Sequence, residues 1–465
     1  MKLLGPKLAV ARATGELARR SGRGGGTSLP GKVLLKLDPH AISALAARLP
    51  QGSVMISATN GKTTTAAMTA AILNRGAVRL IHNSSGANMA GGIATTLMEA
   101  ASRGAGINGE LGLFEIDEFW LPQLTSELKP RSLLLGNLFR DQLDRYGELE
   151  TIAERWREVV ERLPPSCQLV LNADDPLVAA LGAAHGSTLY FGVEDDRMQI
   201  PALQHASDSK NCRNCGTAYT YDAIYLGHLG HYHCEQCGQR RPQPSVTAHS
   251  ITLHGSDSAS FTLRCAKGER EIKLPLPGLY NVYNALAAAA LSLSLDIGLD
   301  QIAEGLGAVS AAFGRAETVT VEGQDLRLML IKNPAGANEV LRTLLLEPEA
   351  LDLLAILNDR IADGRDISWI WDADWELLAG HLRSVVCSGS RAAELAVRLK
   401  YAGVPSASLK VIPELDLALK AALAERANDS KPRTLFSLPT YTALLDLREL
   451  LATQGHVVRY WDQQR

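Results

Sequence analysis

Residues 56–65, ISATNGKTTT, combine the residue types that bind phosphate groups in nucleotide-binding proteins. Backbone N–H groups of such a loop, and the N-terminus of the helix that follows, can surround phosphate oxygens. Lys62 adds a positive charge for the terminal phosphates, and Thr63 adds a hydroxyl for magnesium. The usual loop begins with a glycine where Ile56 stands here. We therefore predict a shortened nucleotide-binding loop, with a chance Gly-Lys-Thr sequence as the alternative.

Four cysteines are clustered with the spacing C-x2-C-x18-C-x2-C: Cys212, Cys215, Cys234 and Cys237. Two such pairs are typical of zinc knuckles that close a tetrahedral site made of four thiolates. Gly216 and Gly238 follow the pairs, as the tight turns of knuckles require. Because four thiolates leave no coordination position open, we predict a structural zinc ion. The other three of the seven cysteines are scattered, which indicates a reducing compartment without a disulfide framework.

Polar side chains follow two apolar runs that are typical of buried strands. Glu115, Asp117 and Glu118 close the run LGLFEIDE, and a carboxylate at such a strand end can hold magnesium. The segment NLFRDQLDRYGE follows another strand and adds candidates for the same cleft: Asn137, Arg140, Asp141 and Asp144. An ordinary solvated loop is the alternative for both groups.

Two further stretches combine polar side chains with a specific setting. Asn281 and Asn284 begin an Ala-rich segment, where an amide can match the donor and acceptor of adenine. Helix capping by Asn281 is the alternative. The stretch LNDRIADGRDISWIWDADWE crowds five aspartates around Trp369 and Trp371, which predicts a site or an interface.

The elements that position these residues alternate between strands and helices. Buried strands are predicted for the segments 53–58, 111–117, 132–138 and 167–176, with helices such as 148–163 between them. This order indicates a doubly wound, mostly parallel α/β sheet. Polar residues 205–243 interrupt it, and antiparallel strands and an Ala-rich helix follow. The composition changes again near residue 315. We predict an ATP-binding domain over 1–315, with a zinc ribbon inserted at 205–243, and a smaller α/β domain over 316–465.

Bulk composition excludes several classes of protein. With 465 residues, 46% hydrophobic content and a net charge of −3, the chain fits a multidomain globular protein and gives no reason to expect nucleic acid. No run of 18 apolar residues predicts a membrane span. Up to residue 39 there are eight Lys or Arg against Glu16 and Asp38. This segment either rests near anionic lipid headgroups or packs as a helix on the protein's own surface. We therefore predict a cytoplasmic protein, and contact with lipid headgroups would place it at the inner face of the plasma membrane.

These segments, in this order, resemble the Mur ligase superfamily of ATP-dependent carboxylate–amine ligases. The similar blocks are TNGKT at 59–63, LNADDP, GLYNVYNALAA and FGRAE. Other blocks resemble one branch of the superfamily, which amidates lipid II together with a GatD-like glutaminase: HNSSGANMAGGI, FEIDE, NLFRDQLDRYGE, the four-cysteine insertion, IKNPAGANEV and ADGRDISWIWDADWE. The similarity extends from about residue 53 to 445.

The resemblance implies roles for individual positions. The loop would bind the ATP phosphates through Thr59, Asn60, Gly61, Lys62, Thr63 and Thr64. Thr63 and Glu115 would hold magnesium, Asn284 would stand beside adenine, and Arg315 would reach the nucleotide from the domain junction. Asp366 would complete the Cys-His pair of the partner glutaminase.

The implied reaction is phosphorylation of the α-carboxylate of D-glutamate in the lipid II stem peptide, followed by attack of ammonia to give D-isoglutamine. No Cys-His pair in the chain resembles a glutaminase site, so the nitrogen would come from a partner subunit. Ala58 and Gln142 depart from the superfamily pattern, which carries a glycine and, in the amino-acid-adding ligases, a metal-binding histidine there. This departure weakens the case for a second magnesium ion. The chain also lacks the domain that grips a UDP-linked precursor, which fits a lipid-linked substrate.

Two alternatives stay open at this point. One is another ligase of the superfamily, which would add an amino acid or extend a folate with glutamate. The four-cysteine insertion and the aspartate-tryptophan stretch count against it. The other is a zinc-ribbon nucleic-acid-binding ATPase, against which the slightly acidic balance counts.

Overall fold

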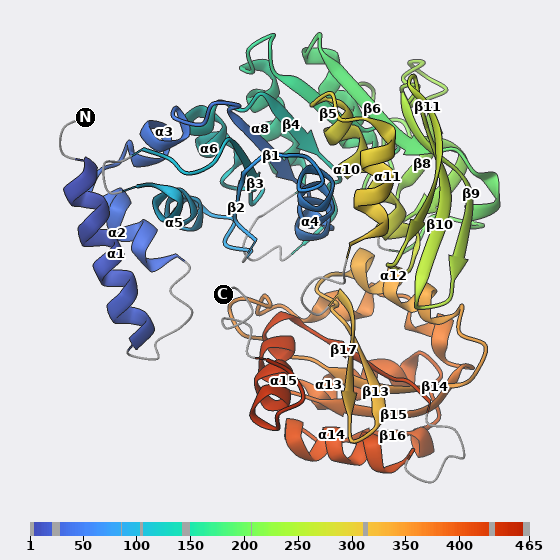
Figure 1. The fold of residues 1–465 in the computed structure, drawn as a ribbon. Coiled ribbons are helices and arrows are strands. Elements are labelled where there is room, and N and C mark those ends of the chain that lie inside the picture. Colours follow the sequence, from blue (N-terminus) through green and yellow to red (C-terminus); the bar gives the residue numbers. More distant parts are fainter. Residues whose placement is uncertain are drawn as a thin grey trace.

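The computed structural model describes residues 4–20, 28–84, 86–102, 106–141, 149–205, 207–309, 315–426 and 433–458, without the side chains of residues 18–20 and 315. The chain forms two bodies, each built around its own sheet (Figure 1). None of the helices in the described ranges is long and apolar enough to cross a membrane. The strand β12 of the smaller body begins at Arg315. The division at 315/316 remains our proposal.

The larger body has a nine-stranded sheet in the order β11-β10-β9-β6-β5-β4-β1-β3-β2. It is parallel from β2 to β9, and β10 and β11 continue it as antiparallel strands. The bounds are β1 Ser53–Ser57, β2 Leu80–His82, β3 Leu111–Glu115, β4 Ser132–Leu135, β5 Gln168–Asn172, β6 Thr188–Val193, β9 Val246–His254, β10 Ser258–Cys265 and β11 Gly268–Leu274. This is the predicted mostly parallel α/β sheet.

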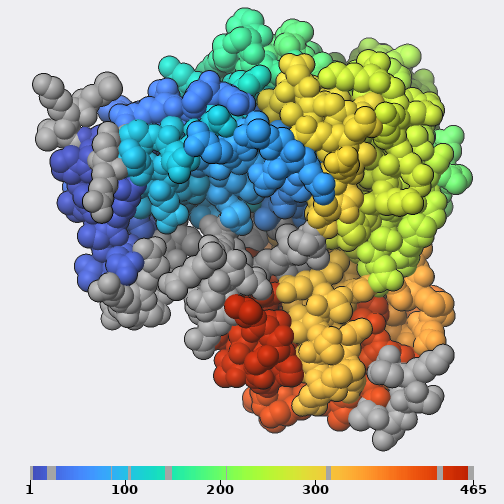
Figure 2. Space-filling model, viewed as in Figure 1, coloured from blue at the N-terminus to red at the C-terminus, as the bar shows by residue number. Residues whose placement is uncertain are grey.

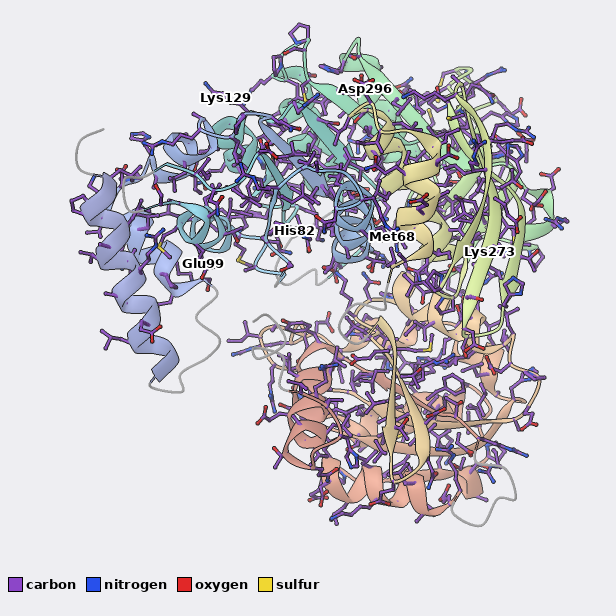
Figure 3. The ribbon with its side chains drawn as sticks, viewed as in Figure 1. Met68, His82, Glu99, Lys129, Lys273 and Asp296 are labelled. Carbon is purple, nitrogen blue, oxygen red and sulfur yellow. The ribbon has the colours of Figure 1, made fainter. Side chains whose placement is uncertain are left out.

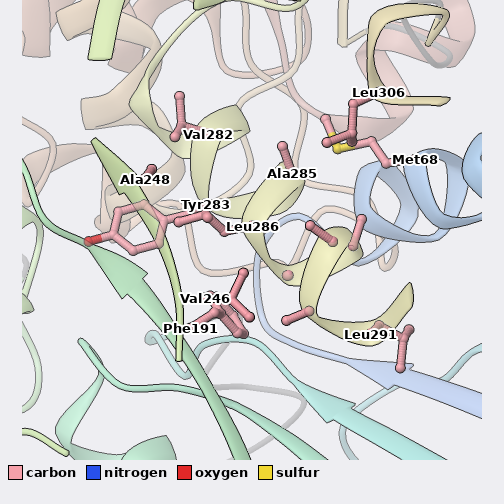
Figure 4. Packing of buried hydrophobic residues seen from close by; sticks show 14 of the residues in the cluster. Met68, Phe191, Val246, Ala248, Val282, Tyr283, Ala285, Leu286, Leu291 and Leu306 are labelled. Atoms are coloured by element: carbon pink, nitrogen blue, oxygen red, sulfur yellow. The ribbon is translucent and has the colours of Figure 1, made fainter. Parts of the chain in front are cut away.

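Both faces of this sheet are covered, which explains why β1 is apolar along its length. Val54 and Ile56 join the core beneath α4, α10 and α11, whereas Met55 joins the core on the opposite face. Figure 4 shows Tyr283 and Leu286 of α10 in the core between this helix and the sheet. The helices of the larger body are α1 Leu4–Arg20, α2 Leu29–Leu37, α3 Ala41–Ala46, α4 Lys62–Leu73, α5 Ala90–Ala100, α6 Leu121–Leu128, α8 Leu149–Glu161, α9 Pro176–Ala179, α10 Leu279–Leu293 and α11 Leu299–Gly307.

The basic N-terminal segment forms a helix that packs on the protein itself. Leu4, Leu8 and Ala11 of α1 are buried in the core that also contains α2 and α5. The Arg12 guanidinium donates to the carbonyls of Met98 and Ala101 at the end of α5, where a positive charge complements the helix dipole. Packing on the protein's own surface, one of the two alternatives for this segment, is therefore realised.

The smaller body has a six-stranded sheet in the order β12-β13-β17-β14-β15-β16, parallel except for the β12–β13 pair. Its strands are β12 Arg315–Val321, β13 Gln324–Met329, β14 Leu351–Ile356, β15 Leu382–Ser388, β16 Leu409–Val411 and β17 Leu435–Pro439. Its helices are α12 Pro334–Leu344, α13 Ala392–Tyr401, α14 Leu415–Ala424 and α15 Tyr441–Thr453. This is the predicted second α/β unit.

The two bodies meet on one side through the turn between β9 and β10. Asp257 in this turn pairs with Arg327 at 2.8 Å, and the Ser256 N–H donates to Glu347 at 2.7 Å. In Figure 2 the yellow-green residues of the larger body touch the orange residues of the smaller body there. Figure 3 places His82, the last residue of β2, at the edge of the parallel sheet that faces the smaller body. The carboxyl ends of the parallel strands therefore face the space between the bodies, where open α/β sheets bind their ligands.

Candidate active site

The phosphate-binding loop joins β1 to α4, as predicted. Gly61 has φ +83°, and a Cβ atom there would lie 2.0 Å from the Asn284 side-chain oxygen, so glycine is required twice over. The helix begins directly at Lys62, and Gly61 offers no side chain to cap it. The first N–H groups of α4 are therefore free of a side-chain cap and suited to an anion.

Asn137, at the end of β4, holds the loop in shape. The Thr59 N–H donates to the Asn137 carbonyl at 3.0 Å, and the Asn60 N–H donates to the Asn137 side chain at 2.9 Å. The Asn137 amide donates back to the Asn60 carbonyl at 3.0 Å. The Thr59 hydroxyl accepts from the Phe139 N–H at 3.1 Å. Neighbouring strand ends thus fix the backbone that would surround the phosphates.

Lys62 is buried and surrounded by the acidic group that follows β3. Its ammonium donates to Glu118 at 2.9 Å and to the Ala58 carbonyl. Burial lowers the pKa of Lys62, but the charges of Glu118, Asp117 and Glu115 outweigh it and raise the pKa above its usual value. Lys62 is therefore charged at neutral pH and held at the loop before any nucleotide arrives.

Glu115 is buried at the end of β3 and oriented by two asparagines. The Asn88 amide donates to its carboxylate at 3.3 Å, and the Asn83 side chain makes two 2.9 Å bonds to its backbone. Thr63, in the first turn of α4, is half-buried. A hydroxyl and a carboxylate are the oxygen ligands that magnesium prefers, so the donor set fits. The sequence blocks held Asn83 and Asn88, but no spacing rule marked them as partners of Glu115.

A cavity lies beside the loop, and residues of both bodies line it. Asn60, Gly61 and Thr64 form one end, and Tyr280, Tyr283 and Asn284 of α10 form a wall. Asn284 is already bonded within the protein: it donates to Asn281 at 3.1 Å and accepts from Thr65 at 3.4 Å. Its place beside adenine therefore stays a proposal. The Arg315 side chain lies outside the described residues.

The smaller body reaches the loop through the segment that leads into α12. The Lys332 ammonium contacts Asp141 at 2.5 Å and the Thr59 carbonyl at 3.1 Å. The side-chain amides of Asn333 and Asn60 pair at 3.0 and 3.3 Å. Sequence reasoning did not single out Lys332 and Asn333, although the quoted block IKNPAGANEV contains both. Gln142 and Asp144, just beyond Asp141, lie outside the described residues.

Asp366 is exposed at the rim of this cleft. It lines a small pocket with Arg140, Asp141, Lys332 and Trp369. Its carboxylate accepts from the Ser368 N–H at 2.8 Å, and this bond lowers the pKa of Asp366. The short 3-10 helix that follows has Ile367 as its N-cap and no side-chain cap, so the alternative that Asp366 caps this segment is met only by the single bond to the Ser368 N–H. An exposed carboxylate retains the capacity to accept a second bond from a partner.

Other aspartates of the same stretch serve the fold. Asp359 pairs with Arg391 at 2.8 Å, and Asp363 accepts from the Thr442 N–H at 2.7 Å. The Asp374 N–H and carboxylate bond to the side chain of Asn338. The acidic crowding that predicted a site is thus largely explained by local structure.

The four clustered cysteines come together as predicted. Their sulfur atoms all lie within 4.8 Å of one another, and the Cys212–Cys237 and Cys215–Cys234 sulfur pairs are 3.5 Å apart. Four zinc–sulfur bonds of about 2.3 Å in a tetrahedron need similar separations. Gly216 and Gly238, at φ +77° and +74°, close two equivalent turns. The donor set therefore fits zinc.

The ribbon extends from the knuckles into the cleft. Its hairpin, β7 Thr220–Leu226 and β8 Leu229–His233, joins the two cysteine pairs. At its tip, buried Leu226 and Leu229 line the cavity beside the loop. His228 between them is fully buried and packs against Phe139, with ring centroids 4.7 Å apart. No pattern in the sequence indicates that the ribbon reaches the nucleotide-binding region.

Comparisons with known families match both bodies. A family model described as "Mur ligase middle domain" matches residues 56–236, and one described as "MurT ligase C-terminal" matches residues 330–444. Solved structures of the same fold include a pseudomurein peptide ligase type C from Methanothermus fervidus, with 23% identity, TM-score 0.67 and 87% and 79% of the two chains covered. A MurF ligase from Thermotoga maritima in complex with ADP has 14% identity, TM-score 0.64 and coverage of 92% and 85%.

Curated relatives match along nearly the full length. The lipid II isoglutaminyl synthase (glutamine-hydrolyzing) subunit MurT of Streptococcus pneumoniae is 33% identical over 448 residues, 96% of each chain. The Staphylococcus aureus protein of the same name is 34% identical over 442 residues, covering 94% of this chain and 96% of its own. With this identity sustained through both bodies, ribbon and cleft included, the chain belongs to the MurT family of Mur ligases.

Proposed function

We propose that this chain is the synthetase subunit of a lipid II isoglutaminyl synthase. It would use ATP to convert the α-carboxylate of D-glutamate in the stem peptide into the carboxamide of D-isoglutamine. The observation that carries this proposal is the identity of 33–34% to two proteins of that name over at least 94% of the chain. The cleft supports it, because phosphate-binding and acidic groups converge there from both bodies.

The first chemical step transfers the γ-phosphoryl group of ATP to the substrate carboxylate and releases ADP. The N–H groups at the start of α4 and the charge of Lys62 stabilise the negative charge on the transferring phosphoryl group. Magnesium held by Thr63 and Glu115 would add further positive charge there. Asn137 keeps the loop in place, so little reorganisation is needed during transfer.

The second step is attack of ammonia on the carbonyl carbon of the acyl phosphate, with inorganic phosphate as the leaving group. Ammonia must arrive uncharged, because ammonium has no lone pair for the attack. We propose that a GatD-like glutaminase releases it from glutamine, with Asp366 orienting that subunit's histidine. The position of Asp366 beside Lys332 and Asp141 supports delivery into the cleft.

The substrate and the nucleotide together favour the cytoplasmic face of the plasma membrane as the place of reaction. Contact of the basic N-terminal helix with lipid headgroups is a separate proposal, since part of α1 packs on the protein itself. Sedimentation with anionic liposomes, comparing the full chain with one that lacks residues 1–28, tests it. Equal recovery of both chains would dismiss the contact.

The function itself is tested by reconstitution. The purified chain, a GatD-like glutaminase, ATP, magnesium, glutamine and lipid II should yield ADP and a lipid II whose mass shows one carboxylate converted to carboxamide. Omission of lipid II should suppress ADP formation. If ADP forms only when a UDP-linked precursor with an amino acid, or a folate with glutamate, replaces lipid II and glutamine, the chain is an amino-acid-adding ligase and the proposal is wrong.

A further inference from the structure

One charged side chain in the cavity beside the loop has no role in the chemistry described so far. Glu339, on α12 of the smaller body, is 5% exposed and lines this cavity together with Tyr280 and Tyr283. Its Oε1 atom is buried and has no hydrogen-bond partner among the described residues. A buried carboxylate oxygen without a partner is costly, so Oε1 is suited to accept a donor from outside the chain, although the Gln204 side chain already forms a hydrogen bond with this carboxyl group.

The position of Glu339 along α12 decides which part of a nucleotide it faces. Asn333, the N-cap of this helix, pairs with Asn60 of the phosphate loop. Glu339 lies six residues further along, roughly 9 Å from that contact at 1.5 Å per residue. A negative charge also repels phosphates. Lys332, the other charged residue of the cavity lining, stands at the phosphate end.

The rest of the cavity is suited to a flat, uncharged group. Leu226 and Leu229 of the ribbon, Val340 of α12 and the two tyrosines of α10 surround the carboxylate with apolar and aromatic surface. Such walls exclude water and strengthen any hydrogen bond made inside. A nucleoside bound with its phosphates at the loop brings N–H and O–H donors into this space.

We propose that Glu339 is the residue that recognises the nucleoside of ATP, by accepting hydrogen bonds from its donors. These donors are the 6-amino group of adenine or the ribose hydroxyls. The inference rests on the proposed ATP-dependent function and assigns it a specificity-determining residue. Binding energy from this contact contributes to nucleotide affinity, since Glu339 lies away from the transferring phosphoryl group.

The charge state of Glu339 makes the contact dependent on pH. Burial raises the pKa of Glu339 to about 7, against smaller opposing effects of the Arg342 charge and of a hydrogen bond from the Gln204 side chain. Donors from the nucleoside favour the ionised form and lower this pKa in the complex. Below pH 7 the free carboxyl must lose a proton before binding, so affinity for ATP falls as the pH drops and levels off above pH 7. Near neutral pH, binding therefore releases protons.

Other ionisable groups surround this position. Lys332, Tyr280 and Tyr283 line the cavity, and Arg197, Arg342 and His205 line the neighbouring pocket that Glu339 also borders. Of these, His205 is the imidazole side chain, and it pairs with Asp374 at 3.0 Å. His205 is retained in a Glu339→Gln variant, so a comparison of that variant with wild type isolates the titration of Glu339.

The test measures ATP binding to the full chain by calorimetry at pH 6 to 8.5, in two buffers of different ionisation enthalpy. Glu339→Gln should weaken ATP binding roughly 10-fold or more at pH 8, as loss of a charge-assisted hydrogen bond implies. It should also abolish the proton release and flatten the pH profile. The matched control is Glu349→Gln, which removes an exposed carboxylate of the same body that pairs with Arg433.

Analogues identify the donor and do not depend on the variant's folding. 2′-Deoxy-ATP lacks a ribose hydroxyl, and purine riboside triphosphate lacks the 6-amino group. Wild type should bind the analogue that lacks the donor to Glu339 about 10-fold more weakly than ATP. In Glu339→Gln that preference should disappear. Equal binding of ATP and both analogues by wild type, or an unchanged affinity in Glu339→Gln, would overturn the inference while ATP binding stands. A wild-type chain that binds no ATP would overturn the proposed function as well.

Discussion

Lys62 shows how the protein itself holds a buried positive charge at the predicted phosphate-binding loop. Three carboxylates raise its pKa, and Glu118 holds its ammonium at 2.9 Å in a buried ion pair. Removing one member of such a pair leaves the other buried without compensation and typically costs about 3–5 kcal/mol. A loss of activity in a Lys62 variant therefore has two possible causes, which a double variant separates.

We expect Lys62→Ala to abolish ATP-dependent amidation and to lower the free energy of unfolding. The double variant Lys62→Ala with Glu118→Gln should recover most of the stability, since no uncompensated carboxylate remains. It should stay inactive, because no neighbour replaces the charge that faces the phosphates. Thermal unfolding and ADP release report the two quantities. Recovery of activity in the double variant would show that Lys62 serves the fold alone.

Asp366 can be tested through the source of nitrogen. Asp366→Asn keeps a side-chain oxygen for the Ser368 N–H but loses the charge that would stabilise a partner's imidazolium. We expect the variant to bind ATP, to fail with glutamine, and to regain activity with high ammonium at alkaline pH. Asp359→Asn, in the same stretch but paired with Arg391, should keep glutamine-dependent activity. An Asp366 variant equally inactive with ammonium would place this residue in the ligase reaction or the fold.

At the scale of elements, the four-cysteine ribbon, whose donor set fits zinc, is also a wall of the cavity beside the loop. The knuckles lie at one end of the β7–β8 hairpin, and Leu226 and Leu229 lie at the other. The hairpin is also hydrogen-bonded to the larger body, because the Gly230 N–H of β8 donates to the Asp174 carbonyl at 3.0 Å. In small metal-binding modules, metal binding contributes much of the free energy of folding. Loss of zinc should therefore also destabilise the hairpin tip that carries Leu226 and Leu229.

We therefore expect Cys234→Ser to remove the bound zinc and to raise the KM for ATP several-fold, while the parallel sheet stays folded. Metal analysis and ATP titration measure the two effects, and hydrogen exchange of β8 shows whether the hairpin has opened. Cys265→Ser, which changes a thiol in β10 outside the cluster, is the control. A variant without zinc but with unchanged ATP affinity would limit the metal to the knuckles.

The elements that sequence reasoning predicted best are those whose pattern is local. β1, β3, β4 and β5 are buried on both faces, so each reads as a short apolar run, and the cysteine spacing defines its site without reference to the rest. β6 was missed because half of its residues are partly exposed and carry no such run. The contacts of Lys332 and Glu339 depend on the approach of two bodies separated in sequence, which no local pattern encodes.

The whole molecule brings its two bodies together on two sides of the active-site region. Away from the loop, the β9–β10 turn meets Arg327 and Glu347. At the loop, Lys332 bridges Asp141 and the Thr59 carbonyl, so the smaller body contributes directly to the backbone that would hold phosphate. Interfaces between domains of one chain are typically more polar than a protein core, and relative motion of the two bodies is the default expectation. We therefore expect ATP binding and closure to be coupled through Lys332.

Lys332→Met tests this coupling, because methionine keeps much of the side-chain length and removes the charge. Loss of charge-assisted hydrogen bonds worth about 1.5–3 kcal/mol should raise the KM for ATP roughly 10-fold or more. Small-angle scattering should show a larger radius of gyration for the variant, since loss of the charged bridge weakens the contact at the loop to the Asn60–Asn333 pair, while the contact at the β9–β10 turn serves as a hinge. Lys420→Met, which removes an exposed ion pair on α14 far from the cleft, should change neither quantity.

A Lys332→Met variant with weakened ATP binding but an unchanged radius of gyration would make Lys332 a phosphate ligand without a role in closure. Unchanged values for both would mean that the bridge seen at the loop contributes nothing in solution.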